Sequence, residues 1–361
     1  MNRVVLVDVL RGFALLGLPL TNLAYMADFS NGYIVDKEND VDVFLTFIID
    51  VFVQGRFRTI FCILFGVSMC LYIEKYGHTL FYQKAQARLY ALCLIGCVHG
   101  VLLWPGDILV NYAVSGLLLI YVIHLDSKTL FKMSVLTIVA PIVLLAYLAL
   151  IFNEQKTVVM TPQIDGVLAF LYRNLTNFAE MLALLPFLTL WYTFGLMLIG
   201  VLIYRSGWLH CGGVSPMYCV FILMPLALVG AIIARWLFFD EHRIVFEVIN
   251  WLFAIPFCLA LISLAAQVPN WIVKKGHLLA LAGRYSLSLY LLQSVLGVMA
   301  FQIVLQNLQL ELRQIHFVAI FVLLTVLQLS LVWWFSRMNV TGPAEMLLIK
   351  LQAVIQKRVI K

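Results

Sequence analysis

Apolar runs of about 20 residues recur along almost the whole chain of 361 residues. An α-helix needs a run of this length to cross the hydrocarbon core of a membrane. The segments between the runs are polar or charged, and none is long enough to form a soluble domain. The pattern predicts about ten transmembrane helices, with limits near 4–26, 56–75, 86–104, 107–124, 129–152, 183–205, 216–238, 246–268, 284–306 and 314–336.

Two further segments are apolar but interrupted by polar residues. Residues 43–55 contain Asp50 and Gln54, and residues 165–182 contain several polar side chains, including Arg173. Each segment either lies along the membrane interface or extends a neighbouring span. The pattern leaves both alternatives open.

Composition supports the membrane class. The chain is 63% hydrophobic and 12% charged, with a mean hydropathy of +1.00. The first apolar run is long and lacks a cleavage site, so we expect it to be retained as a helix. The seven cysteines form neither a disulfide framework nor a zinc motif, and we expect no metal. We predict an all-α polytopic bundle over 1–341 and a short cytoplasmic amphipathic tail helix over 342–361.

The placement of charge predicts the orientation of the bundle. Segments rich in Lys and Arg alternate along the chain with acidic or mixed segments such as 27–42 and 153–165. By the positive-inside rule, both termini then lie in the cytoplasm, which an even number of spans permits. This placement accounts for the net charge of +6, so we expect no nucleic acid partner. The basic segments are 74–88, 124–132, 205–213, 269–284 and 337–361.

Ionisable residues inside the first run mark a candidate site. Asp8 and Arg11 are three residues apart, so on a helix they share a face and can form a structural pair. Asn22 lies on the same face near the other end. Because a charge inside a membrane is costly unless it is paired or faces a polar cavity, such residues indicate function by default.

His99 is the leading candidate for catalysis. It comes late in the third run, and the tight turn Trp104-Pro105-Gly106-Asp107 follows it, so helices three and four are expected to be antiparallel neighbours. Asp107 can then approach His99 and orient it, which would raise its basicity for general-base catalysis. The alternative is that His99 only hydrogen-bonds to a neighbouring helix.

Two arginines open the second run, in the motif Gly55-Arg56-Phe57-Arg58. Being two residues apart, Arg56 and Arg58 point in different directions on a helix. We expect one to contact lipid phosphate and the other to enter the bundle. Arginine binds phosphate or carboxylate groups through paired hydrogen bonds.

Further polar positions fall on the third and ninth runs. Arg88 lies 11 residues before His99 and shares its helix face, unless it is simply a cytoplasmic anchor. In the ninth run, after Arg284, a stripe of Ser286, Tyr290, Gln293 and Gly297 either lines a cavity or joins helices by hydrogen bonds.

Five motifs, in order along the chain, carry a resemblance to a known family. They are Asp8-x-x-Arg11-Gly12-Phe13-Ala14-Leu15-Leu16-Gly17 with Asn22; Arg58-Thr59-x-Phe61-x-x-Leu64-Phe65-Gly66; Arg88 to His99 with Gly106-Asp107-Ile108-Leu109-x-x-Tyr112-Ala113; Gly283-Arg284-x-Ser286-Leu287-x-x-Tyr290-x-x-Gln293-Ser294; and Gly342-Pro343-x-Glu345. Together these motifs resemble the YeiB-type family, a domain-of-unknown-function family placed in the transmembrane acyltransferase superfamily.

The resemblance implies an O- or N-acyltransferase of the bacterial inner membrane. Such an enzyme takes an acyl group from cytosolic acyl-CoA, expected here as acetyl-CoA, and delivers it to an extracytoplasmic acceptor such as a glycan or lipid-linked sugar. His99 would be the general base and Asp107 its orienting group, with Asn22 or Arg56 polarising the thioester. The donor would be held by Arg11, Arg88, Arg284, Ser286 and Gln293.

Two other functions remain open. The same arginines would serve a transporter or flippase of an anionic lipid or metabolite. A non-catalytic membrane scaffold or sensor is the third alternative. Membrane lipids are expected partners in each case, and a homo-oligomer is an open alternative. The acyl chain and the acceptor are not defined by the sequence.

Overall fold

A computed structural model describes residues 2–29, 32–33, 38–152, 166–187, 189–211, 213–240, 242–305 and 312–358. Within these ranges every regular element is a helix. In the described part of the chain, seven helices are long and apolar enough to cross a membrane, and three shorter apolar helices bring the number to ten. The predicted helical membrane bundle is confirmed. The predicted loop 153–165 lies outside the described residues.

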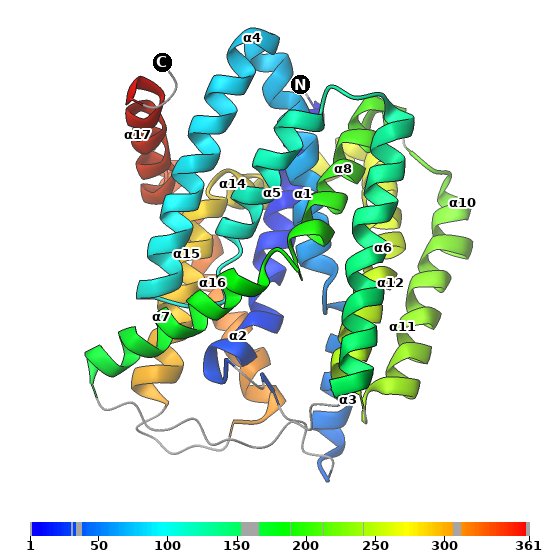
Figure 1. Cartoon of the computed structure of the whole chain (residues 1–361), viewed down its shortest axis with the longest axis vertical. Helices are drawn as coiled ribbons and strands as arrows, with labels where there is room; N and C mark the ends of the chain where they lie inside the picture. The colour runs from blue at the N-terminus through cyan, green and yellow to red at the C-terminus, as the bar shows by residue number, and fades with distance from the viewer. Residues whose placement is uncertain are drawn as a thin grey trace.

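The ten helices run up and down, and both chain ends lie on one side of the bundle, at the top of Figure 1. This arrangement follows from an even number of crossings. In chain order they are α1 (Asn2–Gly17) with α2 (Pro19–Ala27), α3 (Asp40–Phe52) with the first arm of α4 (Arg56–Leu102), the second arm of α4, α5 (Leu109–Val122), α6 (Ser127–Phe152), α8 (Leu190–Arg205), α10 (Pro216–Tyr218) with η1 (Cys219–Leu223) and α11 (Met224–Phe238), α12 (Arg243–Gln267), α15 (Ser286–Met299) with η2 (Ala300–Val304), and α16 (Gln314–Arg337).

The two arms of α4 form a hairpin, which is visible at the top of Figure 1. Helical geometry is interrupted only at Gly77, where φ is 70° and ψ is 163°. Glycine adopts this backbone conformation without steric cost. The connection expected between the predicted spans 56–75 and 86–104 is shorter than predicted, because helix continues on both sides of Gly77. Arg88 lies in the second arm with His99, as the sequence predicted.

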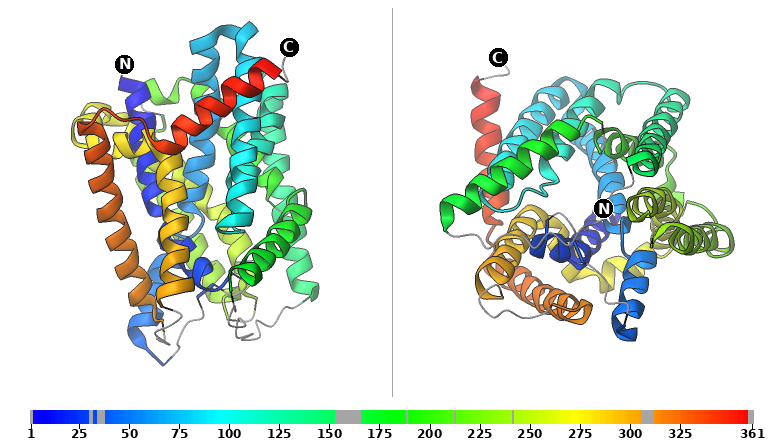
Figure 2. Two further views of the ribbon diagram at one scale, coloured as in Figure 1. Left: turned by 90° about the vertical axis from the view of Figure 1, so that its left-hand side faces the viewer. Right: turned by 60° about the horizontal axis from the view of Figure 1, so that its bottom comes forward.

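The two ambiguous segments adopt different arrangements. Helix α3 begins at its N-cap Asn39 and is joined to α4 through Gly55, where φ is 78°. Of the second segment, residues 167–182 form most of α7 (Val167–Leu184), an amphipathic helix that crosses the bundle obliquely (Figure 1, Figure 2). The predicted span 183–205 therefore begins later than expected, at Leu190 of α8, because α7 continues to Leu184.

Short helices cover the end of the bundle that carries the termini. They are α9 (Trp208–Cys211), α13 (Pro269–Lys275), α14 (His277–Arg284) and the tail helix α17 (Pro343–Arg358). The tail helix packs against the bundle. Glu345 accepts hydrogen bonds from the backbone N–H groups of Leu287 and Ser288 at the start of α15, at 2.8 and 3.1 Å. Gln352 donates to the hydroxyl of Tyr72 on α4 at 3.1 Å.

Reciprocal glycines set a close crossing of α4 and α8 in the core. A Cβ added to Gly66 on α4 would lie 1.9 Å from the carbonyl oxygen of Met197 on α8. A Cβ added to Gly200 on α8 would lie 2.0 Å from the carbonyl oxygen of Ile63 on α4. Small residues at such crossings let helix backbones approach closely, and dispersion contacts then hold the helices together in lipid. Any side chain at either position would force α4 and α8 apart.

We predict that Gly66→Ala and Gly200→Ala each lower the free energy of unfolding by about 1–3 kcal/mol, because backbone atoms cannot move aside as side chains do. Gly116→Ala is the matched control, since a Cβ there would first meet a flexible Leu89 side chain at 2.7 Å. Unfolding by sodium dodecyl sulfate titration in mixed micelles measures the three effects. Equal stability of all three variants would contradict the crossing described here.

Candidate functional site

Two cavities lie one above the other inside the bundle. The proximal cavity, of about 430 Å³, is on the side of the chain ends, and its lining includes Asp8, Arg11 and Arg88. The distal cavity, of about 380 Å³, is on the opposite side, and its lining includes Asn22 and Asp107. Leu18, Ile108 and Tyr290 line both cavities, so these three residues form the wall between them.

Positive charge surrounds the proximal cavity. Arg11 Nη1 lies 3.3 Å from Asp8 Oδ1, and Arg11 Nη2 also donates to the hydroxyl of Ser68. Arg284 approaches the other oxygen of Asp8, with Nε 3.6 Å from Oδ2, but its side chain is 58% exposed and does not line the cavity. Arg88 and Lys75 line the cavity and are exposed. The excess of cations over carboxylates suits a phosphate-bearing ligand.

His99 and Asp107 meet across the turn between α4 and α5. His99 Nδ1 lies 2.8 Å from Asp107 Oδ1, and His99 is 2% exposed. Asp107 Oδ1 also accepts a hydrogen bond from the Tyr290 hydroxyl at 3.4 Å, and Oδ2 accepts one from Val110 N at 2.9 Å. A carboxylate beside Nδ1 places the proton of a neutral imidazole on that nitrogen and leaves the Nε2 lone pair available.

The position of His99 relative to the distal cavity matters for chemistry. Its Nε2 is buried and has no hydrogen-bond partner among the described residues. His99 does not itself line the cavity; it lies behind Asp107 and Tyr290, which do. The ring of Tyr290 lies 5.2 Å from the His99 ring, centroid to centroid. The His99 imidazole is therefore held one layer behind the wall between the two cavities.

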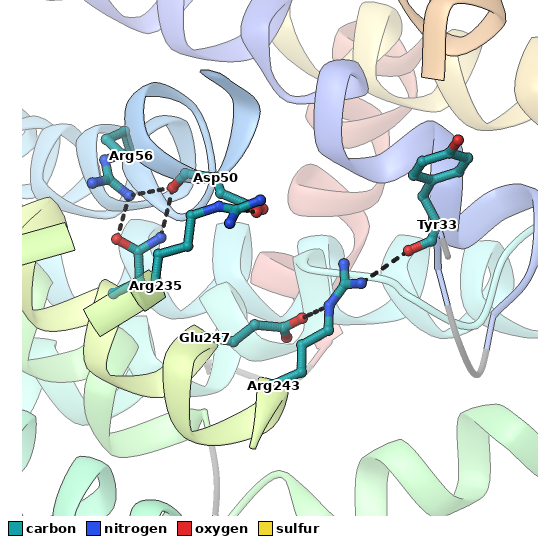
Figure 3. Close-up of polar contacts among 7 residues, drawn as sticks. Tyr33, Asp50, Arg56, Arg235, Arg243 and Glu247 are labelled. Carbon is teal, nitrogen blue, oxygen red and sulfur yellow. Dashed lines mark hydrogen bonds and ion pairs between the residues drawn. The ribbon is translucent and has the colours of Figure 1, made fainter. Parts of the chain in front are cut away.

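The structure separates Arg56 from His99. Arg56 is 1% exposed, and its Nη1 donates to the backbone oxygen of Gln54 at 2.6 Å and to Asn250 Oδ1 at 2.7 Å. Asn250 in turn donates to the backbone oxygen of Asp50 at 2.8 Å, whose carboxylate pairs with Arg235 at 3.1 Å. Figure 3 shows this network, which joins α3, α4, α11 and α12. Arg56 lines neither cavity, so its contacts are structural.

Arg58 is the arginine that enters a cavity. It lines the distal cavity, and its guanidinium lies over the rings of Trp251, 4.2 Å from the centroid, and Tyr192, at 5.6 Å. Neither Arg56 nor Arg58 makes the lipid phosphate contact that we expected for one of them, because Arg56 is buried and Arg58 faces the cavity.

The predicted stripe on α15 divides between two roles. Ser286 and Tyr290 line the proximal cavity. Gln293 is 2% exposed and donates to the backbone oxygen of Leu15 and to Gln328 Oε1, both at 3.2 Å. It joins three helices and lines neither cavity. Both alternatives left open by the sequence are thus realised, at different positions of one helix.

Several residues of the distal cavity gave no signal in the sequence. Phe178 and Met181 of α7 line it, as do Glu247 and Trp251 of α12. Glu247 accepts from Tyr25 at 3.3 Å and from Arg243 at 3.4 Å. These positions come from helices distant in sequence, so no local motif predicts them. The described residues contain no group of three His, Cys, Asp or Glu side chains that could hold a metal ion.

The fold and the two cavities define a class: an α-helical polytopic membrane protein with an internal polar site on each side of a thin wall. Residues 203–354 match the family described as "Protein of unknown function (DUF418)". The predicted resemblance to the YeiB-type DUF418 family is confirmed by this match and by two relatives. No solved structure gives a significant match to the chain.

The relatives are uncharacterised bacterial proteins. The chain is 31% identical over 231 residues to "Uncharacterized protein YeiB" of Escherichia coli (strain K12), which covers 58% of this chain and 57% of YeiB. It is 32% identical over 139 residues to "Uncharacterized protein YxaH" of Bacillus subtilis (strain 168), which covers 36% of this chain and 35% of YxaH. The matches thus span less than two thirds of the length of either relative.

We predict that Asp8 and Arg11 stabilise the fold as one unit. Asp8→Asn and Arg11→Gln should each lower the free energy of unfolding, and the loss in the double variant should be smaller than the sum, with a coupling of about 0.5–3 kcal/mol. The reason is that the second substitution removes a charge already left without its partner. Denaturant titration of the four proteins gives the coupling, and additive losses would show that the pair does not interact.

Proposed function

We propose that this protein is a membrane-embedded acyltransferase that moves an acyl group from acyl-CoA in the proximal cavity to an acceptor in the distal cavity. The observation that carries the proposal is the His99–Asp107 pair, with Nδ1 and Oδ1 2.8 Å apart and Nε2 without a partner in the described structure. The pair adjoins the wall that both cavities share. The proposal includes an inner-membrane location with the chain ends in the cytoplasm, as the charge pattern predicts.

In the proposed reaction, His99 Nε2 accepts the proton of an acceptor hydroxyl or amine. The freed oxygen or nitrogen attacks the thioester carbonyl and forms the new C–O or C–N bond. The C–S bond then breaks, and the CoA thiolate takes the proton back from His99. Asp107 keeps the imidazole in the required tautomer and stabilises its charged form. Because His99 lies behind the wall, substrate binding must bring the acceptor and Nε2 together.

Two other groups have roles in this proposal. Asn22 lines the distal cavity with Asp107, which suits an amide donor to the developing oxyanion. Arg56, the alternative donor, has its Nη1 engaged by backbone oxygens and Asn250 and faces neither cavity. We therefore assign carbonyl polarisation to Asn22 alone.

Transport is the second candidate. Alternating access requires two cavities at opposite ends of a bundle with a barrier between them. The two cavities here have this arrangement, with Leu18, Ile108 and Tyr290 as the barrier. The two functions differ in turnover. Acyl transfer consumes acetyl-CoA in detergent solution, whereas a transporter moves an anion across a sealed vesicle without consuming it.

We predict that His99→Gln lowers acyl transfer by about 10²–10⁴-fold, because an amide cannot take the proton. The assay follows label from radioactive acetyl-CoA into a bacterial lipid and glycan extract, with purified protein. His277→Gln is the control, since His277 is exposed and lines neither cavity. CoA binding should be unchanged in both variants. Near-normal transfer by His99→Gln would remove His99 as the base, and anion flux without turnover would favour the transporter.

We predict that Arg88→Gln weakens CoA binding by about tenfold or more and Arg284→Gln by less, because only Arg88 lines the proximal cavity. Isothermal titration with CoA and with 3′-dephospho-CoA measures both effects. The difference between the two ligands should shrink in Arg88→Gln if this arginine contacts the 3′-phosphate. Equal affinity of Arg88→Gln and the native protein would exclude Arg88 from the donor site.

A further inference from the structure

The distal cavity contains an arginine whose hydrogen-bonding edge is unused. Arg58 Nε and Nη2 are buried, and neither has a hydrogen-bond partner in the part of the chain that the structure describes. These two nitrogens form one side of the guanidinium, where two parallel N–H bonds can bind both oxygens of a carboxylate or phosphate. Arg56 Nε and Nη2 are also buried without a partner among the described residues, but Arg56 lines neither cavity. Arg58 lines the distal cavity, so the unpaired edge that is costly to bury there has space beside it for a ligand.

Aromatic side chains hold this guanidinium in place. Its carbon lies 4.2 Å from the centroid of the Trp251 ring and 5.6 Å from that of Tyr192. The Tyr192 hydroxyl donates to the backbone oxygen of Trp251 at 2.9 Å and lies 3.3 Å from Thr59 Oγ1. The platform under Arg58 is therefore itself fixed by hydrogen bonds. Rings attract the cation without using its N–H groups, which leaves those groups free for an anion.

The two carboxylates of the distal cavity already have partners. Asp107 accepts from His99, Val110 N and the Tyr290 hydroxyl. Glu247 accepts from Tyr25 and pairs with Arg243. Neither carboxylate is paired with Arg58 in the described structure, so the charge of Arg58 remains available to a ligand. A second buried donor, Trp104 Nε1, is also without a partner among the described residues and belongs to the same lining.

The other residues that line the distal cavity indicate that the ligand has an apolar part beside its anionic group. Apolar side chains lie on the cavity wall: Met181 and Leu182 of α7, Leu185 directly after it, and Phe57 of α4. A volume of about 380 Å³ accommodates more than an inorganic ion. The cavity thus offers one paired donor site for an oxyanion and an apolar wall beside it.

We propose that the distal cavity binds an amphiphile through a carboxylate or phosphate group held by Arg58 Nε and Nη2. If the acyltransferase function is correct, this amphiphile is the acyl acceptor; the binding site itself does not depend on that function. Lipid headgroups and soluble metabolites both supply such oxyanions, and the test separates them.

Full-length protein in dodecyl maltoside is titrated calorimetrically with four probes and no acyl donor. Glycerol 1-phosphate and succinate are the soluble oxyanions, dihexanoyl phosphatidylglycerol is the anionic lipid, and dihexanoyl phosphatidylcholine is its zwitterionic counterpart. Arg58→Gln removes the charge, and Arg58→Lys keeps the charge but lacks the paired edge. Arg337→Gln is the matched control, because Arg337 also lies over a tryptophan ring, at 5.1 Å, but lines neither cavity.

We expect Arg58→Gln to weaken binding of an oxyanion probe about tenfold to hundredfold, with Arg58→Lys also weakened and Arg337→Gln unchanged. If Arg58→Gln weakens the binding of phosphatidylglycerol alone, the ligand is a lipid headgroup. If it also weakens the binding of the soluble probes, the oxyanion alone is sufficient for binding.

Three results would overturn the proposal: equal affinities of Arg58→Lys and the native protein, no binding of any oxyanion probe, or binding that is lost in Arg88→Gln instead. The last result would place the anion in the proximal cavity. Because no acyl-CoA is present, this outcome is independent of the acetyl-CoA assay. Binding that depends on Arg58 together with absent acyl transfer would support the site and reject the enzyme.

Discussion

The Asp107 carboxylate is the interaction on which the middle of the bundle depends. Its oxygens accept from His99 on α4, from the first turn of α5 and from Tyr290 on α15. Tyr290 in turn accepts from Ile108 N at 3.2 Å. A buried carboxylate is tolerated only when donors compensate for the loss of water, and here those donors come from three helices. The same contacts build the wall between the cavities and fix the tautomer of His99.

Carboxylates also accept hydrogen bonds from backbone N–H groups at the start of other helices. Asp42 accepts from Gln314 N at the start of α16, at 3.1 Å, and Glu345 of the tail helix accepts from the start of α15. The first N–H groups of a helix lack intrahelical partners and carry partial positive charge, so a carboxylate from another segment satisfies both needs. In a membrane, where water is scarce, such contacts join segments far apart in sequence. The tail helix is thereby part of the bundle, and its Leu348 lines the proximal cavity.

Several of the charged side chains within the described bundle form ion pairs, whereas Arg56 and Arg58 have no carboxylate partner there. Asp8 with Arg11, Asp50 with Arg235, and Glu247 with Arg243 are ion pairs, which lowers the cost of burying them. Arg58 lies over two aromatic rings and lines a cavity instead. Arg56 hydrogen-bonds to Gln54 and Asn250 and lines neither cavity, so only Arg58 is available to a ligand in the distal cavity. Arg56 and Arg58 differ in role although they are two residues apart on one helix.

The sequence alone determined what depends on local properties. The apolar runs predicted the ten helices, because spanning a membrane requires only a length of apolar chain. The short turn before Asp107 predicted its approach to His99, since few residues separate the two helices. Only the tertiary structure decided which arginine faces the cavity and which side of α15 joins helices. Those outcomes depend on helix rotation and on side chains from α7, α8 and α12, and no local pattern encodes either.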